Sequence, residues 1–139
     1  MRVTISSGLL DRIFAHAAAT PDREACGLLF GDGAAIRDVR AAANVAADPR
    51  HRFEVDPRTL FAAIRAERAG GMRVVGHYHS HPFGRPEPSP RDAADAGEEA
   101  GRLWLIVAGR EARLWRTVER AHSGTALHGV FETADLAVR

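Results

Sequence analysis

Three histidines at alternate positions, His77, His79 and His81, form the stretch of this chain with the clearest potential for chemistry. They follow residues 73–76, a short run with two valines and a glycine that predicts a buried strand. Since side chains alternate along a strand, the three imidazoles would project from one face at successive positions. Two imidazoles with this spacing can hold one metal ion between them. Pro82 would end the strand because it has no N–H to donate.

A third metal ligand would have to come from another element, and Asp92 is the nearest suitable residue, eleven positions after His81. Ser89, Pro90 and Asp92 occur in the order of an N-cap, a first helical residue and a third helical residue, which is typical of a helix start. A helix start held in this way would also hold a metal-binding carboxylate in place. Two histidines and one carboxylate leave the fourth position of a tetrahedral zinc ion open for water, as in a catalytic site.

The order of these residues resembles the JAMM motif of the MPN-domain metalloproteases. The motif consists of a glutamate far upstream, then His-x-His-Pro, six residues and Ser-x-x-Asp, and its parts here are Glu24, His79, His81, Pro82, Ser89 and Asp92. The resemblance implies one zinc ion per chain, held by His79, His81 and Asp92. It also implies that Glu24 is the general base and that Ser89 donates to the oxyanion of the tetrahedral intermediate.

The case for Glu24 from the residues alone is indirect. Taken by itself, this residue would be a surface carboxylate at the start of a strand, as most glutamates are. A zinc-bound water, however, needs a base that accepts its proton and delivers it to the leaving amine, and a histidine cannot do this while it coordinates the metal. Residues 24–31 resemble the glutamate-bearing strand of the family. Glu24 is suitably placed if that strand neighbours the histidine strand.

The substrate is implied by the resemblance. MPN metalloproteases cut after the C-terminal glycine of ubiquitin or of a ubiquitin-like partner. A compact chain of this length is similar to the stand-alone prokaryotic type, so the implied partner is a ubiquitin-like or sulfur-carrier protein that ends in Gly-Gly. We expect its tail to bind extended along a sheet edge. Whether the bond is a linear peptide or an isopeptide is left open, as is a homodimeric state.

Three neighbours of the motif have less definite roles. His77 stands where members of the family often carry a large aromatic residue, and we expect it to form hydrogen bonds near the site or to pack there. Tyr78 and Phe83 are candidates for the lining of a substrate groove, with a packing role as the alternative. The other histidines show no pattern and are expected to be ordinary core or surface residues: His16, His51, His122 and His128.

Other functions fit the sequence less well. A histidine-triad nucleotide hydrolase has the spacing of His77, His79 and His81, but it requires apolar residues between them, and Ser80 is polar. The triad of that family also lies close to the chain end, whereas 58 residues follow His81 here. A non-catalytic MPN scaffold is the second alternative, although such scaffolds lack the metal residues. Zinc deaminases require a Pro-Cys-x-x-Cys pair, which a chain with one cysteine does not have.

Length and composition indicate one globular domain over residues 1–139, with 45% hydrophobic and 27% charged residues. The formal net charge is +1 and the arginines are scattered, so we expect neither nucleic acid nor a membrane surface as a partner. The single Cys26 excludes an internal disulfide. The first residues contain no apolar leader, and a cytoplasmic location is expected.

The elements that must position these residues can be outlined from the hydrophobic pattern. We expect helices that begin at Ser6 or Ser7, at Pro57 and near Ser89, the second with Leu60, Phe61 and Ile64 on its buried face. Expected strands cover residues 2–5, 25–30, 36–47, 53–55, 72–81, 103–107, 112–118 and 127–131, the last at a sheet edge, and 119–124 form a polar turn. The fold class is α/β. We expect a three-layer α-β-α domain with a mixed, largely antiparallel sheet, similar to MPN and cytidine deaminase folds.

Overall fold

The computed structural model describes residues 1–120 and 124–139. His122 and part of the expected polar turn at 119–124 lie outside these residues. Within them, the strands are β1 (Arg2–Ile5), β2 (Cys26–Gly31), β3 (Ile36–Ala42), β4 (Arg73–Ser80), β5 (Leu103–Ala108), β6 (Glu111–Thr117) and β7 (Phe131–Val138). The helices are α1 (Ser7–Ala19), α2 (Pro57–Arg68) and α3 (Pro90–Asp95).

The described strands form one mixed sheet in the order β1-β7-β6-β5-β4-β2-β3. The pairs β1/β7 and β4/β5 are parallel, and the other pairs are antiparallel. Four of these six pairs are antiparallel, so the prediction of a mixed, largely antiparallel sheet is confirmed. The sheet curls far enough that β1 lies next to the turn before β3, where the N–H of Thr4 donates to the carbonyl oxygen of Ala34 at 2.9 Å.

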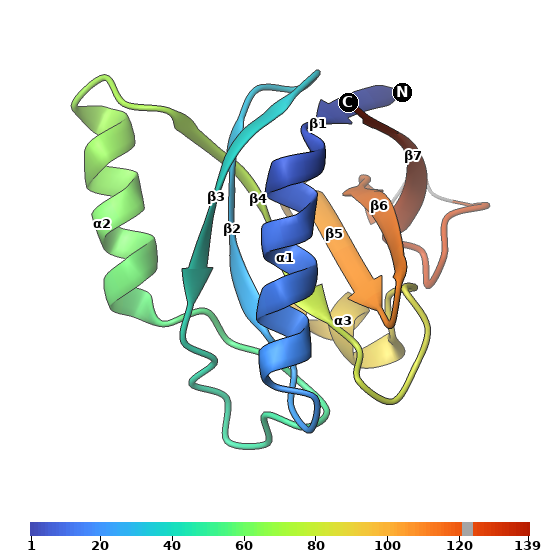
Figure 1. Ribbon diagram of the computed structural model, residues 1–139. Coiled ribbons are helices and arrows are strands. Elements are labelled where there is room, and N and C mark those ends of the chain that lie inside the picture. The colour runs from blue at the N-terminus through green and yellow to red at the C-terminus, as the bar shows by residue number, and fades with distance from the viewer. Residues whose placement is uncertain (121–123) are drawn as a thin grey trace.

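Helix α1 covers the concave face of this sheet (Figure 1). It begins as predicted, where the Ser6 hydroxyl oxygen accepts the N–H of Leu9 at 3.1 Å, and it ends at Ala19, with Thr20 as its C-cap. Ile13 of α1 is fully buried. It belongs to the largest hydrophobic cluster, which takes alternate residues from the central strands.

Helices α2 and α3 lie against the other face. Ala63 of α2 packs with Leu28 and Val74, and Ala93 of α3 packs with Trp104 and Ile106. Since side chains alternate along each strand, the two faces have separate cores. The sheet between them is the frame that carries the motif residues.

The buried face predicted for α2 was partly wrong. Phe61 is 56% exposed, whereas Ala63 is fully buried. The helix turns its small residue toward the sheet, where the backbones come close, and the aromatic ring points outward.

Two predicted strands were also wrong. Residues 53–55 form no regular strand, and Val55 makes only an isolated bridge to Asn44. The last strand is β7 at Phe131–Val138 instead of residues 127–131, and it pairs with both β1 and β6, so it is not an edge. It was missed because only one face of β7 meets the core, and its residues include few large apolar side chains.

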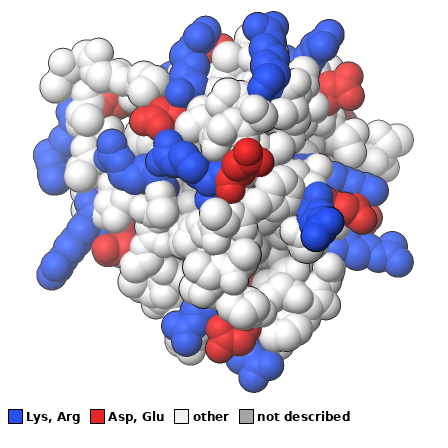
Figure 2. Space-filling view, in the orientation of Figure 1, with Lys and Arg blue, Asp and Glu red and all other residues white. Residues whose placement is uncertain are grey.

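None of the helices among the described residues is long and apolar enough to cross a membrane. On the face that Figure 2 shows, arginine and acidic side chains are interspersed.

Candidate active site

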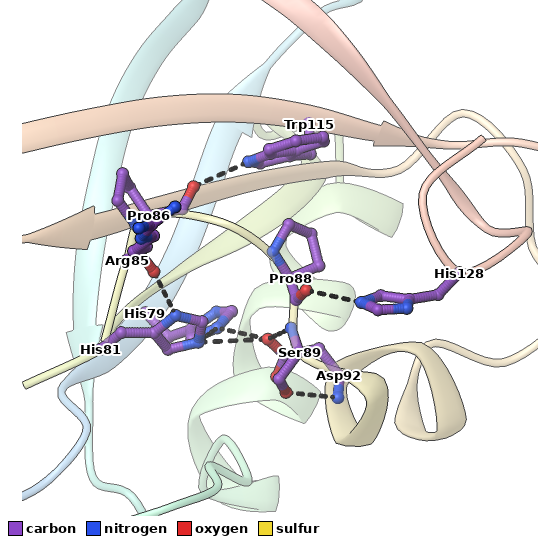
Figure 3. Close-up of polar contacts among 9 residues, drawn as sticks. All are labelled: His79, His81, Arg85, Pro86, Pro88, Ser89, Asp92, Trp115 and His128. Carbon is purple, nitrogen blue, oxygen red and sulfur yellow. Dashed lines mark hydrogen bonds and ion pairs between the residues drawn. The ribbon is translucent and has the colours of Figure 1, made fainter. Parts of the chain in front are cut away.

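Two histidines and an aspartate meet at the end of β4 (Figure 3). His79 Nε2 lies 3.0 Å from His81 Nε2 and 3.3 Å from Asp92 Oδ2, and His81 Nε2 lies 3.1 Å from the same oxygen. His79 is fully buried in β4, and His81 follows directly after the strand. The three atoms that the sequence predicted as metal ligands are therefore within hydrogen-bond distance of one another.

The start of α3 fixes the carboxylate of this group. The Ser89 hydroxyl oxygen accepts the N–H of Asp92 at 3.0 Å, and Asp92 Oδ2 accepts the N–H of Ser89 at 2.9 Å. This reciprocal pair is a capping box, which satisfies two helix-end donors at once. One oxygen of Asp92 thus serves the helix cap and faces both imidazoles.

The loop between β4 and α3 is held at three points. Arg85 O lies 2.7 Å from His81 Nδ1, and Pro86 O accepts from Trp115 Nε1 at 2.9 Å. Pro88 O lies 3.0 Å from His128 Nε2 (Figure 3). These contacts tie the loop back toward the sheet and place Ser89 beside the histidines.

The donor set fits one small metal ion. Tetrahedral zinc with bonds of about 2.0–2.2 Å to nitrogen and oxygen requires ligand atoms that are roughly 3.3 Å apart. The separations of 3.0 to 3.3 Å among His79, His81 and Asp92 are close to this value. His81 also has the partner that metal-binding histidines commonly have, a carbonyl oxygen at its other ring nitrogen.

Glu24 presents a second carboxylate to the same histidines. One ligand atom from each of Glu24, His79 and His81 lies within 4.8 Å of the other two. Glu24 is only 5% exposed, and its Oε1 has no hydrogen-bond partner among the described residues. Two sets of three ligands are thus conceivable. We favour the set with Asp92, because its distances match those between ligands of one metal ion, and Glu24 then stands beside the metal position.

The sequence of the chain is similar to those of known proteins. Residues 6–118 match the family model Prok-JAB, described as prokaryotic homologs of the JAB domain. The chain belongs to this family. The resemblance of its motif to the stand-alone prokaryotic JAMM/MPN proteins is therefore confirmed.

Two relatives of this Prok-JAB chain have informative names. A desampylase from Haloferax volcanii is 41% identical over an alignment of 114 positions, and the match covers 77% of this chain and 81% of the relative. A probable TtuB-protein conjugate cleaving protease from Thermus thermophilus is 32% identical over an alignment of 119 positions, and the match covers 79% of this chain and 80% of that protein.

The fold has a counterpart among solved structures. A JAB1/MPN domain protein from Archaeoglobus fulgidus superimposes with a TM-score of 0.58 at 20% identity, covering all of this chain and 96% of that one. This likeness concerns the fold alone, which in this chain is a mixed α/β arrangement.

The two carboxylates of the Prok-JAB site differ in their electrostatics. Burial raises the pKa of Glu24 to about 8, against the lowering effect of nearby His81. Burial would also raise the pKa of Asp92, but hydrogen bonds from His79 and His81 hold it well below its ordinary value. Asp92 is therefore ionised and paired, whereas Glu24 holds a proton at neutral pH in the absence of a cation.

This difference predicts a pH-dependent stability of the metal-free protein. The pKa of Glu24 is 4.5 in an ordinary environment and about 8 in the folded protein, so the folded state binds this proton more tightly than the unfolded state does. The contribution of this proton to the free energy of unfolding is complete below about pH 4.5 and is lost as the pH rises to about 8. Compared with wild type, Glu24→Gln should have little effect on Tm at about pH 5 and should raise it at about pH 9, because glutamine stays neutral. Thermal unfolding of chelator-treated protein measures this. Glu98→Gln, which changes an exposed glutamate, is the control, and an equal effect of Glu24→Gln at both pH values contradicts the prediction.

His77 and Tyr78 lie on opposite faces of β4. The centroid of the His77 ring lies 4.2 Å from that of Trp104 and 4.9 Å from that of Phe53. Burial lowers the pKa of His77 to about 3, so this ring is neutral. A role for Tyr78 in a substrate groove is wrong. Its side chain is 2% exposed in the core under α1, and its hydroxyl oxygen lies 2.7 Å from His16 Nδ1.

Phe83, in contrast, lies at a surface hollow next to the ligands. The hollow has a volume of about 190 Å³ and is lined mainly by Glu24, Arg50, His51, His81, Phe83 and Ser89. Phe83 is 60% exposed, and the Arg50 guanidinium lies 5.2 Å from its ring centroid. This position agrees with the expectation that Phe83 lines a groove.

Three residues near the site were missed by the analysis of the sequence. Phe53 stacks on His79, Asn44 bonds to the backbone of Glu24, and His128 holds the loop before Ser89. Phe53 gave only a weak strand pattern, and neither Asn44 nor His128 belongs to a recognisable spacing. The roles of these three residues follow from contacts between segments that are distant in the chain, and a local sequence pattern does not contain such contacts.

Proposed function

We propose that this chain is a zinc-dependent isopeptidase that hydrolyses the bond after the C-terminal Gly-Gly of a ubiquitin-like or sulfur-carrier protein. The observation that carries the proposal is the convergence of His79, His81 and Asp92 within 3.3 Å of one another, with Glu24 buried beside them. The names of the relatives support the substrate class, since one is a desampylase and another a conjugate cleaving protease.

In this proposal, His79, His81 and Asp92 hold one zinc ion per chain. When bound, zinc supplies Lewis acidity that polarises a carbonyl and makes a bound water more acidic. The protein contributes the imidazoles of His79 and His81 and an ionised carboxylate. Against the lowering effect of burial, the bonds to Asp92 and to the Arg85 backbone raise the pKa of His81, so this ring would give up any added proton when a metal binds. Burial lowers the pKa of His79, so its ring keeps a lone pair available for a metal.

Glu24 is the proton carrier. A cation beside a buried carboxylate favours its ionised form, so metal binding would bring the pKa of Glu24 down from about 8. The carboxylate would accept a proton from the attacking water and then deliver it to the departing amine. Its burial keeps bulk water from competing for that proton.

Ser89 would stabilise the oxyanion. Its oxygen accepts the N–H of Asp92, so its own hydroxyl proton is free to donate elsewhere. It lines the same hollow as Glu24 and His81, where a carbonyl oxygen of the substrate would lie. A donor placed there acts mainly on the charge that develops during the reaction.

The remaining predictions about the chain stay predictions. They are a single three-layer, deaminase-like domain over residues 1–139, a cytoplasmic location, the absence of nucleic-acid and membrane partners, and binding of the substrate tail along a sheet edge. Strand β3 is the edge closest to the site, since Ala42 pairs with Cys26, which pairs with His79.

The test uses two substrates built from the same sulfur-carrier protein, whose own sequence ends in Gly-Gly. One is a sulfur-carrier protein joined to a lysine side chain of a second protein, and the other carries a linear peptide extension. Mass spectrometry should show zinc-dependent release of the carrier with a free C-terminal glycine from the first, stopped by a chelator and restored by zinc. Cleavage of the linear extension alone contradicts the isopeptidase assignment. Cleavage of neither substrate by zinc-loaded protein contradicts the whole proposal.

A further inference from the structure

The segment 43–56, between β3 and α2, is a folded element beside the site. Asn44 and Val55 form an isolated antiparallel bridge. The N–H of Val45 donates to Glu54 O at 3.0 Å, and the N–H of Asp56 donates to Ala43 O at 3.0 Å. The two ends of the segment are thus joined to each other by backbone hydrogen bonds.

The side-chain amide of Asn44 uses its full bonding capacity. Its Nδ2 donates to Glu24 O at 2.9 Å and to Arg52 O at 3.1 Å. Its Oδ1 accepts the N–H groups of Ala46 and Glu54 at 3.0 and 3.1 Å. One side chain therefore ties both ends of the segment to the backbone of Glu24.

Glu24 depends on this segment because it lies outside the sheet ladder. Strand β2 begins at Cys26, two residues later. The carbonyl of Glu24 accepts from Asn44, and its N–H donates to Pro49 O at 2.7 Å. Both backbone polar groups of Glu24 are thus bonded to the segment 43–56, whereas those of the next residue, Ala25, are bonded to Ser80 of β4. The segment therefore helps to fix the backbone from which the Glu24 carboxylate extends.

The same segment contacts a metal ligand through Phe53. The Phe53 ring stacks on that of His79, with centroids 4.3 Å apart and planes 20° apart. His79 Nδ1 is buried without a hydrogen-bond partner among the described residues, whereas His81 Nδ1 has Arg85 O at 2.7 Å. Metal-binding histidines are usually oriented by a bond at that nitrogen. For His79, the stacked ring of Phe53 is the contact that can orient the imidazole.

We propose that the segment 43–56 sets the geometry of the site through two positioning residues, Asn44 for Glu24 and Phe53 for His79. The inference rests on the proposed function. It adds that a segment distant from the motif determines both the orientation of a ligand and the place of the base.

The test of Phe53 measures the metal site directly. Phe53→Leu should raise the zinc dissociation constant about 10-fold, as the loss of an orienting partner does, and should change the visible spectrum of the cobalt-substituted protein. Phe53→Tyr keeps the ring and should behave as wild type. Phe61→Leu makes the same replacement at an exposed position of α2 and is the control. If Phe53→Leu does not fold, Phe53→Met fills the space without a ring and carries the same expectation. Wild-type zinc affinity and spectrum in a ring-free variant overturn the role of Phe53.

The test of Asn44 separates the base from the metal. Asn44→Asp keeps the acceptor oxygen and loses the donors to Glu24 O and Arg52 O. We expect kcat to fall about 10- to 100-fold, with KM and zinc affinity unchanged. Hydrogen–deuterium exchange of the peptide that contains the Glu24 amide should become faster. Glu54→Ala removes an exposed side chain of the same segment and is the control. Unchanged kcat and exchange in Asn44→Asp overturn the role of Asn44.

These outcomes are distinct from a failure of the proposed function. Zinc affinity, the cobalt spectrum and hydrogen exchange require no substrate. A wild-type protein that binds no zinc contradicts the proposed function. A wild-type protein that binds zinc and cleaves the conjugate, with positioning variants that behave in the same way, contradicts this inference alone.

Discussion

Asp92→Asn should abolish stable zinc binding while the protein stays folded. Asparagine keeps an oxygen that can accept the N–H of Ser89, so the start of α3 is retained, but it removes the negative charge between the two imidazoles. We expect zinc affinity to fall by more than about 100-fold, beyond the loss typical of an outer partner. Elemental analysis of dialysed protein, purified without chelators or metal-affinity resin, measures zinc per chain.

The control for this variant is Asp95→Asn, a change of an exposed aspartate on the same helix. It should retain about one zinc per chain, the content that the proposal gives to wild type. If Asp92→Asn retains zinc with wild-type affinity, Asp92 is not a ligand. The set of Glu24, His79 and His81, whose ligand atoms also lie close together, would then be the metal site.

Glu24→Gln, unlike Asp92→Asn, should lower the rate of cleavage and leave zinc binding unchanged. Glutamine fills the same buried place but accepts no proton, so kcat for cleavage of the Gly-Gly conjugate should fall by about 1,000-fold, within the range typical of a lost general base. Zinc content should stay at the wild-type value, because the three proposed ligands are unchanged. Cleavage is followed by mass spectrometry of the released carrier protein.

Glu98→Gln, an exposed glutamate beyond α3, serves as the matched control and should cleave at the wild-type rate. Loss of zinc in Glu24→Gln would show that Glu24 is a ligand. Wild-type kcat with zinc retained would show that the proton is carried by another group. The variants of Asp92 and Glu24 together thus assign the two carboxylates, one to the metal and one to the proton.

Much of the site could be predicted from the sequence because its signals are local. Alternation along β4 and the proline after it indicate that His79 and His81 lie at the end of a strand. The N-cap, proline and acidic residue that begin α3 act within one helical turn, so the orientation of Asp92 follows from adjacent residues. The capping of α1 and α2 was predicted for the same reason.

A prediction failed where tertiary packing overrode a local pattern. The pattern in α2 placed Phe61 on the buried face, but in the structure Ala63 packs against Leu28 and Val74 of the sheet and Phe61 is exposed. For Tyr78, groove lining and packing were both left open. Alternation along β4 turns its side chain away from the histidines and into the core, where its hydroxyl oxygen lies 2.7 Å from His16 Nδ1. In both cases the side chains that meet these residues belong to elements that are distant in the chain.

By itself, the sequence of this protein determines the motif, the strand end and the helix start that present it, because each depends on residues within one turn or one strand. The tertiary structure decides that Glu24 stands beside the histidines, that Phe53 stacks on His79 and that Asn44 holds the backbone of Glu24. These contacts join segments separated by 20 or more residues. Their geometry follows from the pairing of β2 with β4 and from the path of residues 43–56, which no local periodicity specifies.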